Sequence, residues 1–390
     1  MRRAGRAALV GGLVLAAYGG GVLTGVVGSR AGEPAPQSAG VLDEAAARIM
    51  ADAARPVSRE QLDQAAVEGM LKALGDRWSA YFKPSEFTSF QAGLDGRYSG
   101  IGVWLRSAQD GEVFVGSVSP SSPADEAGIL AGDRLVSVAG EPVGTTSLST
   151  VASALRGDPG TRLPLVLSRD GEAVTVSLTR SELASDDVIV TRLRGGVEVV
   201  RIASFSRGVG AAVRKAITSS PTSDQPAPAG VVLDLRGNAG GLLTEAVEVA
   251  SSFLRGGAVV SYEKRGEPVI HLDAVGTGDV TVPLVVLVDG GTASAAEVVA
   301  GALQDRNRAV VVGSTTYGKG SVQEPRALSD GSAIELTVGR YLTPSGRSLD
   351  GVGIDPDVVV SVRAGAASAE QRALEVLRGL VAASDLAARG

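Results

Sequence analysis

The sequence predicts an α/β fold, in which a layered α/β core follows a small helical unit and a compact strand-rich domain. After residue 180, Val- and Leu-rich runs such as GVVLDLRG and VPLVVLVDGG alternate with helical segments. Continuous apolar strands that are each followed by a helix are typical of a sheet buried on both faces. Before that point, Asp110-Gly111 and Asp170-Gly171 join strand-like runs as hairpin turns. A chain of 390 residues suits two or three domains.

The N-terminus has the pattern of a membrane anchor. Arg2, Arg3 and Arg6 precede an uncharged, mostly apolar run over residues 7–28, which approaches the roughly 20 residues that a spanning helix needs. Positive charge before the run favours a cytoplasmic N-terminus. We therefore expect residues 1–30 to be a signal anchor that leaves the rest of a single-pass protein outside the cytoplasm. A cleaved signal peptide and a secreted protein are the alternative.

A short linker and a helical region follow. Residues 31–40 are rich in Gly, Pro and Ser and predict a linker. Helical spacing from Val41 ends before Pro56, and Ser58 with Gln61 has the pattern of a capping box that opens a second helix. We expect an N-terminal helical region over 41–95, the strand-rich domain over 96–180, the core over 181–365 and a last helix over 366–390.

Composition excludes several function classes. A net charge of -6 without a basic stripe argues against nucleic acid. With no cysteine, the chain has no thiol nucleophile, disulfide or cysteine metal site. The single histidine, His271, lies in the polar stretch GEPVIHLDAVGTG, where a solvated loop or hairpin position is the interpretation. A Ser-His-Asp triad and a histidine metal centre are therefore disfavoured, and we expect no metal and no cofactor.

A lysine base is the remaining route to a serine nucleophile. Such a lysine must be neutral, and burial among apolar groups favours its neutral form. Lys319 stands between two glycines in YGKGSVQ, directly after the apolar run AVVVGS, and Ser294 lies where a buried strand turns into a helix. A hydroxyl there adjoins free helix amides that can receive an oxyanion. On these residues alone, a serine before a helix is more often an N-cap, here with a capping box that Glu297 completes, and Lys319 is more simply interpreted as a solvated loop lysine.

The segment DLRGNAGGLL predicts a strand that ends in a glycine-rich turn. Glycines there let backbone N–H groups face a ligand, which could be an oxyanion or a phosphate. A nucleotide triphosphate site is disfavoured because no GxxxxGK[ST] pattern is present.

Four motifs in order, DLRGNAGGLL, GTASAAEVVAGALQD, YGKGSVQ and YLTPSGRSLDGVGIDPD, resemble those of the C-terminal processing (tail-specific) peptidases over residues 41–365. The resemblance implies a crotonase-like peptidase core with an inserted PDZ domain. By carry-over, Ser294 is the nucleophile, Lys319 the general base and Gln323 the residue that orients the lysine. The implied oxyanion hole is the amides of Ala295 and Gly240, with Gly241 as the alternative to Gly240. Ala239 departs from the family's usual serine.

The run YSGIGVWL, with VSPSSPADEAGILAGDRLVSVAGEPV after it, resembles a PDZ domain. Such a domain adds a peptide as an extra strand and captures its terminal carboxylate on loop amides. The resemblance implies that the capture loop is Ser99, Gly100, Ile101 and Gly102. The implied activity is a serine endopeptidase that docks a free, apolar C-terminus of an exported protein and cleaves through an acyl-enzyme. A resting form with Ser294 and Lys319 apart is compatible with this family, in which the PDZ commonly gates the dyad.

Two other functions remain open on the sequence alone. One is an exported PDZ scaffold on an inactive peptidase-like core, and the other is an intramembrane serine/lysine enzyme, which the distance along the chain from the apolar run to Ser294 disfavours. An activating partner or a homo-oligomer is also left open. The implied partners are protein or peptide substrates, and the membrane through the N-terminal helix.

Overall fold

The computed structural model describes residues 40–107, 111–144, 146, 148–218, 227–361 and 366–389. The expected signal segment and nearly all of the linker lie outside these ranges. Within them, no helix has both the length and the apolar character needed to cross a membrane. The chain divides into two compact units, with the boundary between Gly69 and Met70.

The first unit contains α2 (Val41–Asp52) and most of α3 (Arg59–Leu74). The predicted capping box is confirmed, because Ser58 N donates to Gln61 Oε1 at 2.9 Å and Gln61 N donates to Ser58 Oγ at 3.1 Å. The guanidinium of Arg59 pairs with both Asp43 and Asp63, and thereby links the two helices. Local capping and surface ion pairs therefore organise this helical unit.

A short segment then leads into the strand-rich domain. After α3, the chain forms β1 (Ala80–Phe82) and α4 (Pro84–Leu94). Phe82, Phe87 and Phe90 pack their rings together, with the Phe82 and Phe90 centroids 5.2 Å apart. A two-stranded ladder of β2 (Arg97–Gly100) and β9 (Ser181–Ala184) stands at the entry and exit of the domain.

The strand-rich domain is a sheet in the order β3-β4-β5-β7-β8, with β6 beside β5. Its core includes the fully buried side chains of Ile101, Leu163, Leu165 and Leu167. The predicted turn at Asp170-Gly171 joins β7 to β8, whereas Asp110 lies outside the described residues. The bounds are β3 (Val103–Ser107), β4 (Val113–Val118), α5 (Pro123–Glu126), β5 (Arg134–Val138), β6 (Glu141–Pro142), α6 (Leu148–Leu155), β7 (Arg162–Arg169) and β8 (Glu172–Thr179).

The core is built on a six-stranded sheet in the order β10-β11-β12-β15-β16-β19. Only the β10 and β11 pair is antiparallel among these described strands. The bounds are β10 (Val188–Arg192), β11 (Val197–Ile202), α7 (Val209–Thr218), β12 (Gly230–Asp234), α8 (Leu243–Ser251), β15 (Leu284–Val288), α9 (Ala295–Asp305), β16 (Val310–Gly313), β19 (Val358–Val359) and α10 (Ala366–Arg389).

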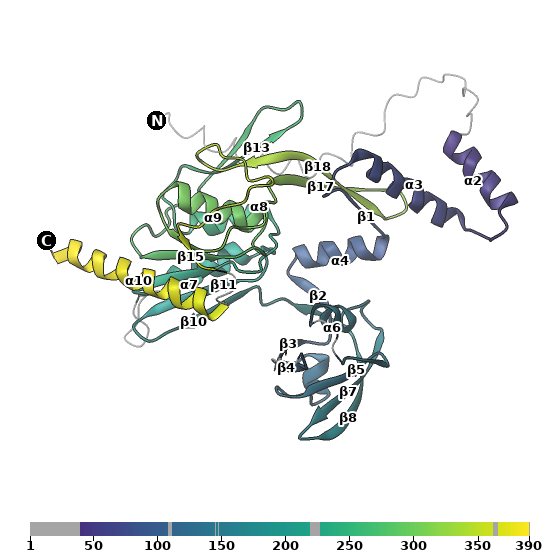
Figure 1. Cartoon of the computed structure of the whole chain (residues 1–390), viewed down its shortest axis with the longest axis horizontal. Helices are drawn as coiled ribbons and strands as arrows, with labels where there is room; N and C mark the ends of the chain where they lie inside the picture. Colours follow the sequence, from purple (N-terminus) through teal and green to yellow (C-terminus); the bar gives the residue numbers. More distant parts are fainter. Residues whose placement is uncertain are drawn as a thin grey trace, which may run out of the picture. The chain divides into compact units, whose positions relative to one another are not determined.

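Alternation along the central strands explains their uninterrupted apolar sequence. Val231 and Leu233 of β12 join the cluster under α7, α8 and α9, whereas Val232 between them joins the cluster under α10. Figure 1 shows α10, in yellow, lying across the strands of this sheet. Because both faces of the sheet are covered, β15 is apolar and buried at all five positions, and β12 is apolar up to Asp234 at its end.

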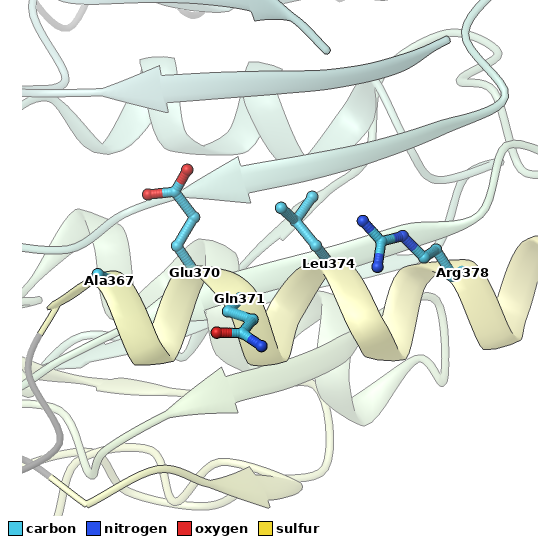
Figure 2. Close-up of a pocket in the computed structure, with 5 residues that line it drawn as sticks. All are labelled: Ala367, Glu370, Gln371, Leu374 and Arg378. Carbon is cyan, nitrogen blue, oxygen red and sulfur yellow. The ribbon is translucent and has the colours of Figure 1, made fainter. Parts of the chain in front are cut away.

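Helix α10 also carries polar side chains along the sheet. Figure 2 shows Glu370, Leu374 and Arg378 projecting from the same side of the helix. With Ala367 and Gln371 they line an open pocket of about 280 Å³. Glu370 reaches Arg236 on the loop after β12 at 3.6 Å, so the helix is tied to that loop as well as to the apolar face.

A second sheet, in the order β1-β18-β13-β14 with β17 on β18, completes the core. Its strand β13 (Ala258–Lys264) pairs with β14 (Ile270–Asp273), and β17 (Ser321–Ala327) forms a long hairpin with β18 (Ala333–Leu342). Strand β1 joins the far end of this hairpin through Ala80 and Glu335. The hairpin thus connects the loop of Lys319 to the segment that precedes the strand-rich domain.

Candidate active site

The three motif loops lie at one edge of the parallel sheet. The glycine-rich loop follows β12, the Ser294 loop follows β15, and the Lys319 loop follows β16, and these three strands are neighbours. The carboxyl ends of parallel strands meet at the same edge, where α/β proteins hold their ligands. The topology therefore brings together segments that the sequence separates.

Ser294 stands at a strained position between β15 and α9. Its backbone has φ 55° and ψ -119°, which is unusual for a residue other than glycine. Such strain persists only where the surrounding structure enforces it, and it is concentrated at functional sites. The hydroxyl is therefore presented at the N-terminus of α9 by a sharp turn, which an ordinary N-cap does not require.

The carboxylate of Glu297 joins the serine loop to the lysine loop. It is fully buried, and its Oε2 accepts from the amides of Ser294 at 2.9 Å and Lys319 at 2.8 Å. Its Oε1 accepts from Thr316 Oγ1 at 2.5 Å and from the Gly318 amide at 2.8 Å. The capping pattern predicted only the bond to Ser294, so sequence reasoning missed this second role of Glu297.

The lysine loop is held tightly, as its two glycines suggested. A Cβ on Gly320 would lie 2.1 Å from the amide of Asp350, and one on Gly318 would lie 3.0 Å from the amide of Val352. The Gly318 carbonyl also accepts from the Gly351 amide at 2.9 Å. The segment around Gly351 therefore packs directly against the backbone that carries Lys319.

The side chain of Lys319 does not bond to Ser294 in this structure. No hydrogen bond joins its Nζ to Ser294 Oγ within the described chain, and the ammonium lies 5.1 Å from the ring centroid of Trp78. Glu335 on β18 interacts electrostatically with Lys319, and burial raises the pKa of that Glu335 carboxyl. The loops of the candidate dyad are thus assembled while the two reacting atoms are not hydrogen-bonded.

Gln323 lies on β17 and does not hydrogen-bond to Lys319. Its Nε2 donates to Ser321 Oγ at 2.7 Å and to Thr337 Oγ1 at 3.2 Å. The pairing of β17 with β18 is irregular between Val322 and Gln323. The lysine-orienting role of Gln323 therefore stays a prediction that requires rearrangement of this amide or of the lysine.

The amides expected for an oxyanion hole differ in availability. Ala295 is the first residue of α9, so its amide has no acceptor inside the helix. The Gly240 amide donates to Asn238 Oδ1 at 2.8 Å, whereas the Gly241 amide donates to no described residue. Gly241 is therefore the freer of the two glycine donors in this structure.

Gly240 nevertheless lies against the nucleophile. A Cβ at this position, where φ is 109°, would lie 2.8 Å from Ser294 Cβ and 3.2 Å from the Ala295 amide. Asn238 is fully buried and fixes the loop through two hydrogen bonds. Its side-chain Nδ2 donates to the Ile202 carbonyl at 2.9 Å, and its backbone carbonyl accepts from the Ala293 amide at 2.9 Å. Sequence reasoning did not single out Asn238, because no local sequence pattern indicates that a polar residue in a glycine-rich turn is buried.

The predicted capture loop precedes an edge strand of the strand-rich domain. Strand β3 pairs only with β4 in that sheet among the described strands, and it contacts α6. The carbonyls of Ile101 and Gly102 are both bonded, whereas their amides donate to no described residue. Ser99 Oγ is buried without a hydrogen-bond partner in the described chain. These donors suit a carboxylate at the start of an open strand edge.

His271 lies apart from the candidate dyad. It is exposed on β14, and its Nδ1 is 2.7 Å from Ser261 Oγ on the neighbouring strand, so the predicted hairpin position is confirmed. No cluster of three His, Cys, Asp or Glu side chains among the described residues could hold a metal ion.

Comparison with protein families gives two matches along the chain. The model of peptidase family S41 matches residues 196–360, which include all three loops, and a PDZ domain model matches residues 114–169.

Curated proteins and solved structures are similar over most of the chain. The carboxy-terminal-processing protease of Bartonella bacilliformis is 34% identical over 310 residues, which are 77% of this chain and 70% of that protein. The carboxy-terminal processing protease CtpA of Bacillus subtilis is 32% identical, over 81% of this chain and 68% of its own. The solved photosystem II D1 C-terminal processing protease is 33% identical with a TM-score of 0.51, over 80% of this chain and 85% of that chain.

Proposed function

The chain belongs to the carboxy-terminal processing proteases of peptidase family S41, and on that premise we propose that Ser294 and Lys319 are its catalytic dyad. It is a serine-type peptidase with a PDZ domain. The single observation that carries the proposal is that one buried carboxylate, Glu297, accepts from the amides of both Ser294 and Lys319. This shared acceptor holds the backbones of Ser294 and Lys319 at fixed positions relative to each other, as two residues of one active site require.

In the proposed reaction, Ser294 Oγ attacks the carbonyl carbon of the scissile peptide bond while neutral Lys319 Nζ takes the hydroxyl proton. The amides of Ala295 and of Gly241 or Gly240 receive the oxyanion. Lys319 then returns the proton to the leaving amine as the C–N bond breaks, and an acyl ester on Ser294 remains. Lys319 next takes a proton from water as the water oxygen attacks the ester carbonyl, and it returns that proton to Ser294 Oγ as the ester bond breaks. This step releases the new carboxyl end and restores the neutral amine.

This reaction requires Lys319 to move from the position that it occupies here. A base must lie within hydrogen-bond reach of the proton that it removes, although such bonds are often absent before substrate binds. Gln323 is proposed to orient the amine once it reaches Ser294. The backbone amide of Lys319 is already held by Glu297, so the proposed movement is one of the lysine side chain.

We propose that the PDZ domain selects the substrate by its free, apolar C-terminus. The terminal carboxylate would bond to the amides of Ile101 and Gly102, with Ser99 and Gly100 beside it, and the last residues would extend the sheet along β3. The open edge of β3 and the unused donors before it support this assignment. Anchoring through residues 7–28, with exported proteins as substrates, completes the proposal and rests on the sequence pattern alone.

The test uses the full chain and an unstructured protein that ends in a free apolar C-terminus, together with the same protein amidated at that end. Wild type is expected to cleave the free form about tenfold or more faster than the amidated form, because amidation removes charge-assisted hydrogen bonds. Ser294→Ala is expected to cleave neither form. Equal rates on both forms would refute carboxylate capture. Binding without cleavage by wild type would instead favour a scaffold or a missing activating partner.

A further inference from the structure

Trp78 lies in the turn before β1, and its ring packs against the lysine loop. Its ring faces Lys319 Nζ at 5.1 Å, lies 5.7 Å from the Tyr317 ring and lies 4.6 Å from the Arg77 guanidinium carbon. A cation within about 6 Å of an indole centroid is attracted by the negative face of the ring. The indole therefore offers the ammonium form of Lys319 a site that Ser294 does not provide.

The turn that carries Trp78 is fixed to the β17–β18 hairpin. Asp76 accepts from the Trp78 amide at 3.1 Å and from Ser79 Oγ at 2.5 Å. Ser79 Oγ in turn accepts from the Thr337 amide at 3.3 Å. Burial acts to raise the pKa of the Asp76 carboxyl, but hydrogen bonds from Ser79, Thr337 and the Trp78 amide together lower it.

The same turn reaches the residue that is proposed to orient the lysine. Thr337 Oγ1 accepts from Gln323 Nε2 at 3.2 Å, and Thr337 N donates to Ser79. Trp78 contacts Lys319 directly, and Ser79 contacts the strand residue that holds Gln323. A single short turn thus contacts Lys319 through Trp78 and, through Ser79, the strand residue that accepts from Gln323.

We propose that Trp78 is a positioning residue that binds the Lys319 ammonium in the resting enzyme and so controls when this amine becomes the base for Ser294. The proposal rests on the proposed dyad and extends it. A cation–π contact stabilises the protonated amine and offers nothing comparable to the neutral amine. Among neighbouring groups, the Glu335 carboxylate also favours the ammonium, whereas the Arg77 guanidinium, which lies over the same ring, repels it. The Tyr317 ring packs against the indole.

The first measurement reads the contact without relying on activity. The chain has two tryptophans, so a full-length Trp104→Phe enzyme reports Trp78 alone by its fluorescence. A pH titration of Trp78 emission is expected to show a transition that disappears in Trp104→Phe/Lys319→Met, because the cation that perturbs the indole is absent. Identical titration curves with and without the Lys319 side chain would overturn the proposal.

The second measurement follows the pH–activity profile of cleavage. Trp78→Leu keeps apolar bulk without a ring and is expected to move the rising limb to lower pH by about 0.5 to 1 unit. Trp78→Phe, which keeps a weaker aromatic face, should return part of that shift. A uniform loss of rate in both variants with an unmoved limb would mean a purely structural role and refute the proposal.

The two measurements separate this proposal from the proposed dyad. Should Ser294→Ala retain cleavage, the dyad fails, while the fluorescence titration still decides whether Trp78 binds Lys319. Should the dyad hold and the titration show no dependence on Lys319, only the role of Trp78 is rejected.

Discussion

The carboxylate of Glu297 and the amide of Lys319 are joined by a 2.8 Å hydrogen bond across 22 residues of sequence. Because the same oxygen accepts from the Ser294 amide, the backbones of the candidate nucleophile and base are held in one register. These two bonds to Glu297 involve only backbone amides, and the Lys319 side chain itself lies against the ring of Trp78.

Replacement of Glu297 by Gln should impair both folding and cleavage. The amide keeps one acceptor oxygen and turns an NH₂ group toward N–H donors, so buried amides lose partners. Each such loss costs about 1–3 kcal/mol, and we expect the free energy of unfolding to fall by about 2–4 kcal/mol. Chemical denaturation and cleavage rates measure the two effects. Glu172→Gln, at an exposed position at the start of β8, is the control, and an unchanged rate in Glu297→Gln would contradict the role given to this carboxylate.

Gly102→Ala should weaken binding of a peptide with a free C-terminus. Gly102 has φ 82°, and a Cβ there would lie 2.2 Å from Ser122 Cβ, so the capture loop must shift. Gly171→Ala is the matched control, because φ is 88° in the same domain but the added Cβ would meet nothing within 4 Å. Peptide affinity measured by calorimetry should fall about tenfold or more in Gly102→Ala only. Equal affinities for the two variants would place carboxylate capture elsewhere.

Gly240→Ala should slow cleavage strongly, whereas Gly237→Ala in the same loop should leave the rate nearly unchanged. Both glycines have positive φ, but only a Cβ on Gly240 meets the Ser294 side chain, at 2.8 Å, whereas one on Gly237 meets nothing within 4 Å. The expected loss for Gly240→Ala is about 100-fold or more in kcat, because small displacements of a nucleophile are costly. A comparable loss in both variants would indicate general loop strain and not contact with the nucleophile.

The PDZ domain should lose stability in acid through Asp133. The hydrogen bond from Arg169 lowers the pKa of Asp133 against its desolvation, and Leu130 N also donates to this carboxylate. Since the folded pKa is depressed, the stabilisation is present above about pH 4 and is lost as the pH falls through the folded value. Thermal unfolding from pH 6 to pH 2 should show this loss. In Asp133→Asn the acid-dependent part should be smaller, and an equal dependence would refute the assignment.

Much of the fold follows from the periodicity of single segments. The Val- and Leu-rich strands, the helix after Ser294 and the Ser58–Gln61 cap are local patterns, and the structure has them where they were expected. The alternation of Val231, Val232 and Leu233 between two cores explains why those strands carried no polar face.

Long-range contacts could not be predicted in the same way. A capping box at the start of α9 is a sufficient local reason for a glutamate at position 297. No sequence pattern therefore indicated its bonds to Thr316, Gly318 and Lys319. Trp78 lies in a helical region whose partner no pattern indicates, so its approach to Lys319 depends on the pairing of β1 with β18. The hydrogen bond that occupies the Gly240 amide likewise depends on the side-chain rotamer of Asn238.

The most direct test of the account is the initial rate of cleavage by Ser294→Ala and by Lys319→Ala, with Lys72→Ala on the exposed face of α3 as the control. All variants should unfold at nearly the wild-type temperature, so that differences in rate report chemistry. The account predicts a loss of about 1,000-fold or more in each dyad variant and a wild-type rate in the control. Cleavage at a near wild-type rate by either Ser294→Ala or Lys319→Ala would contradict it.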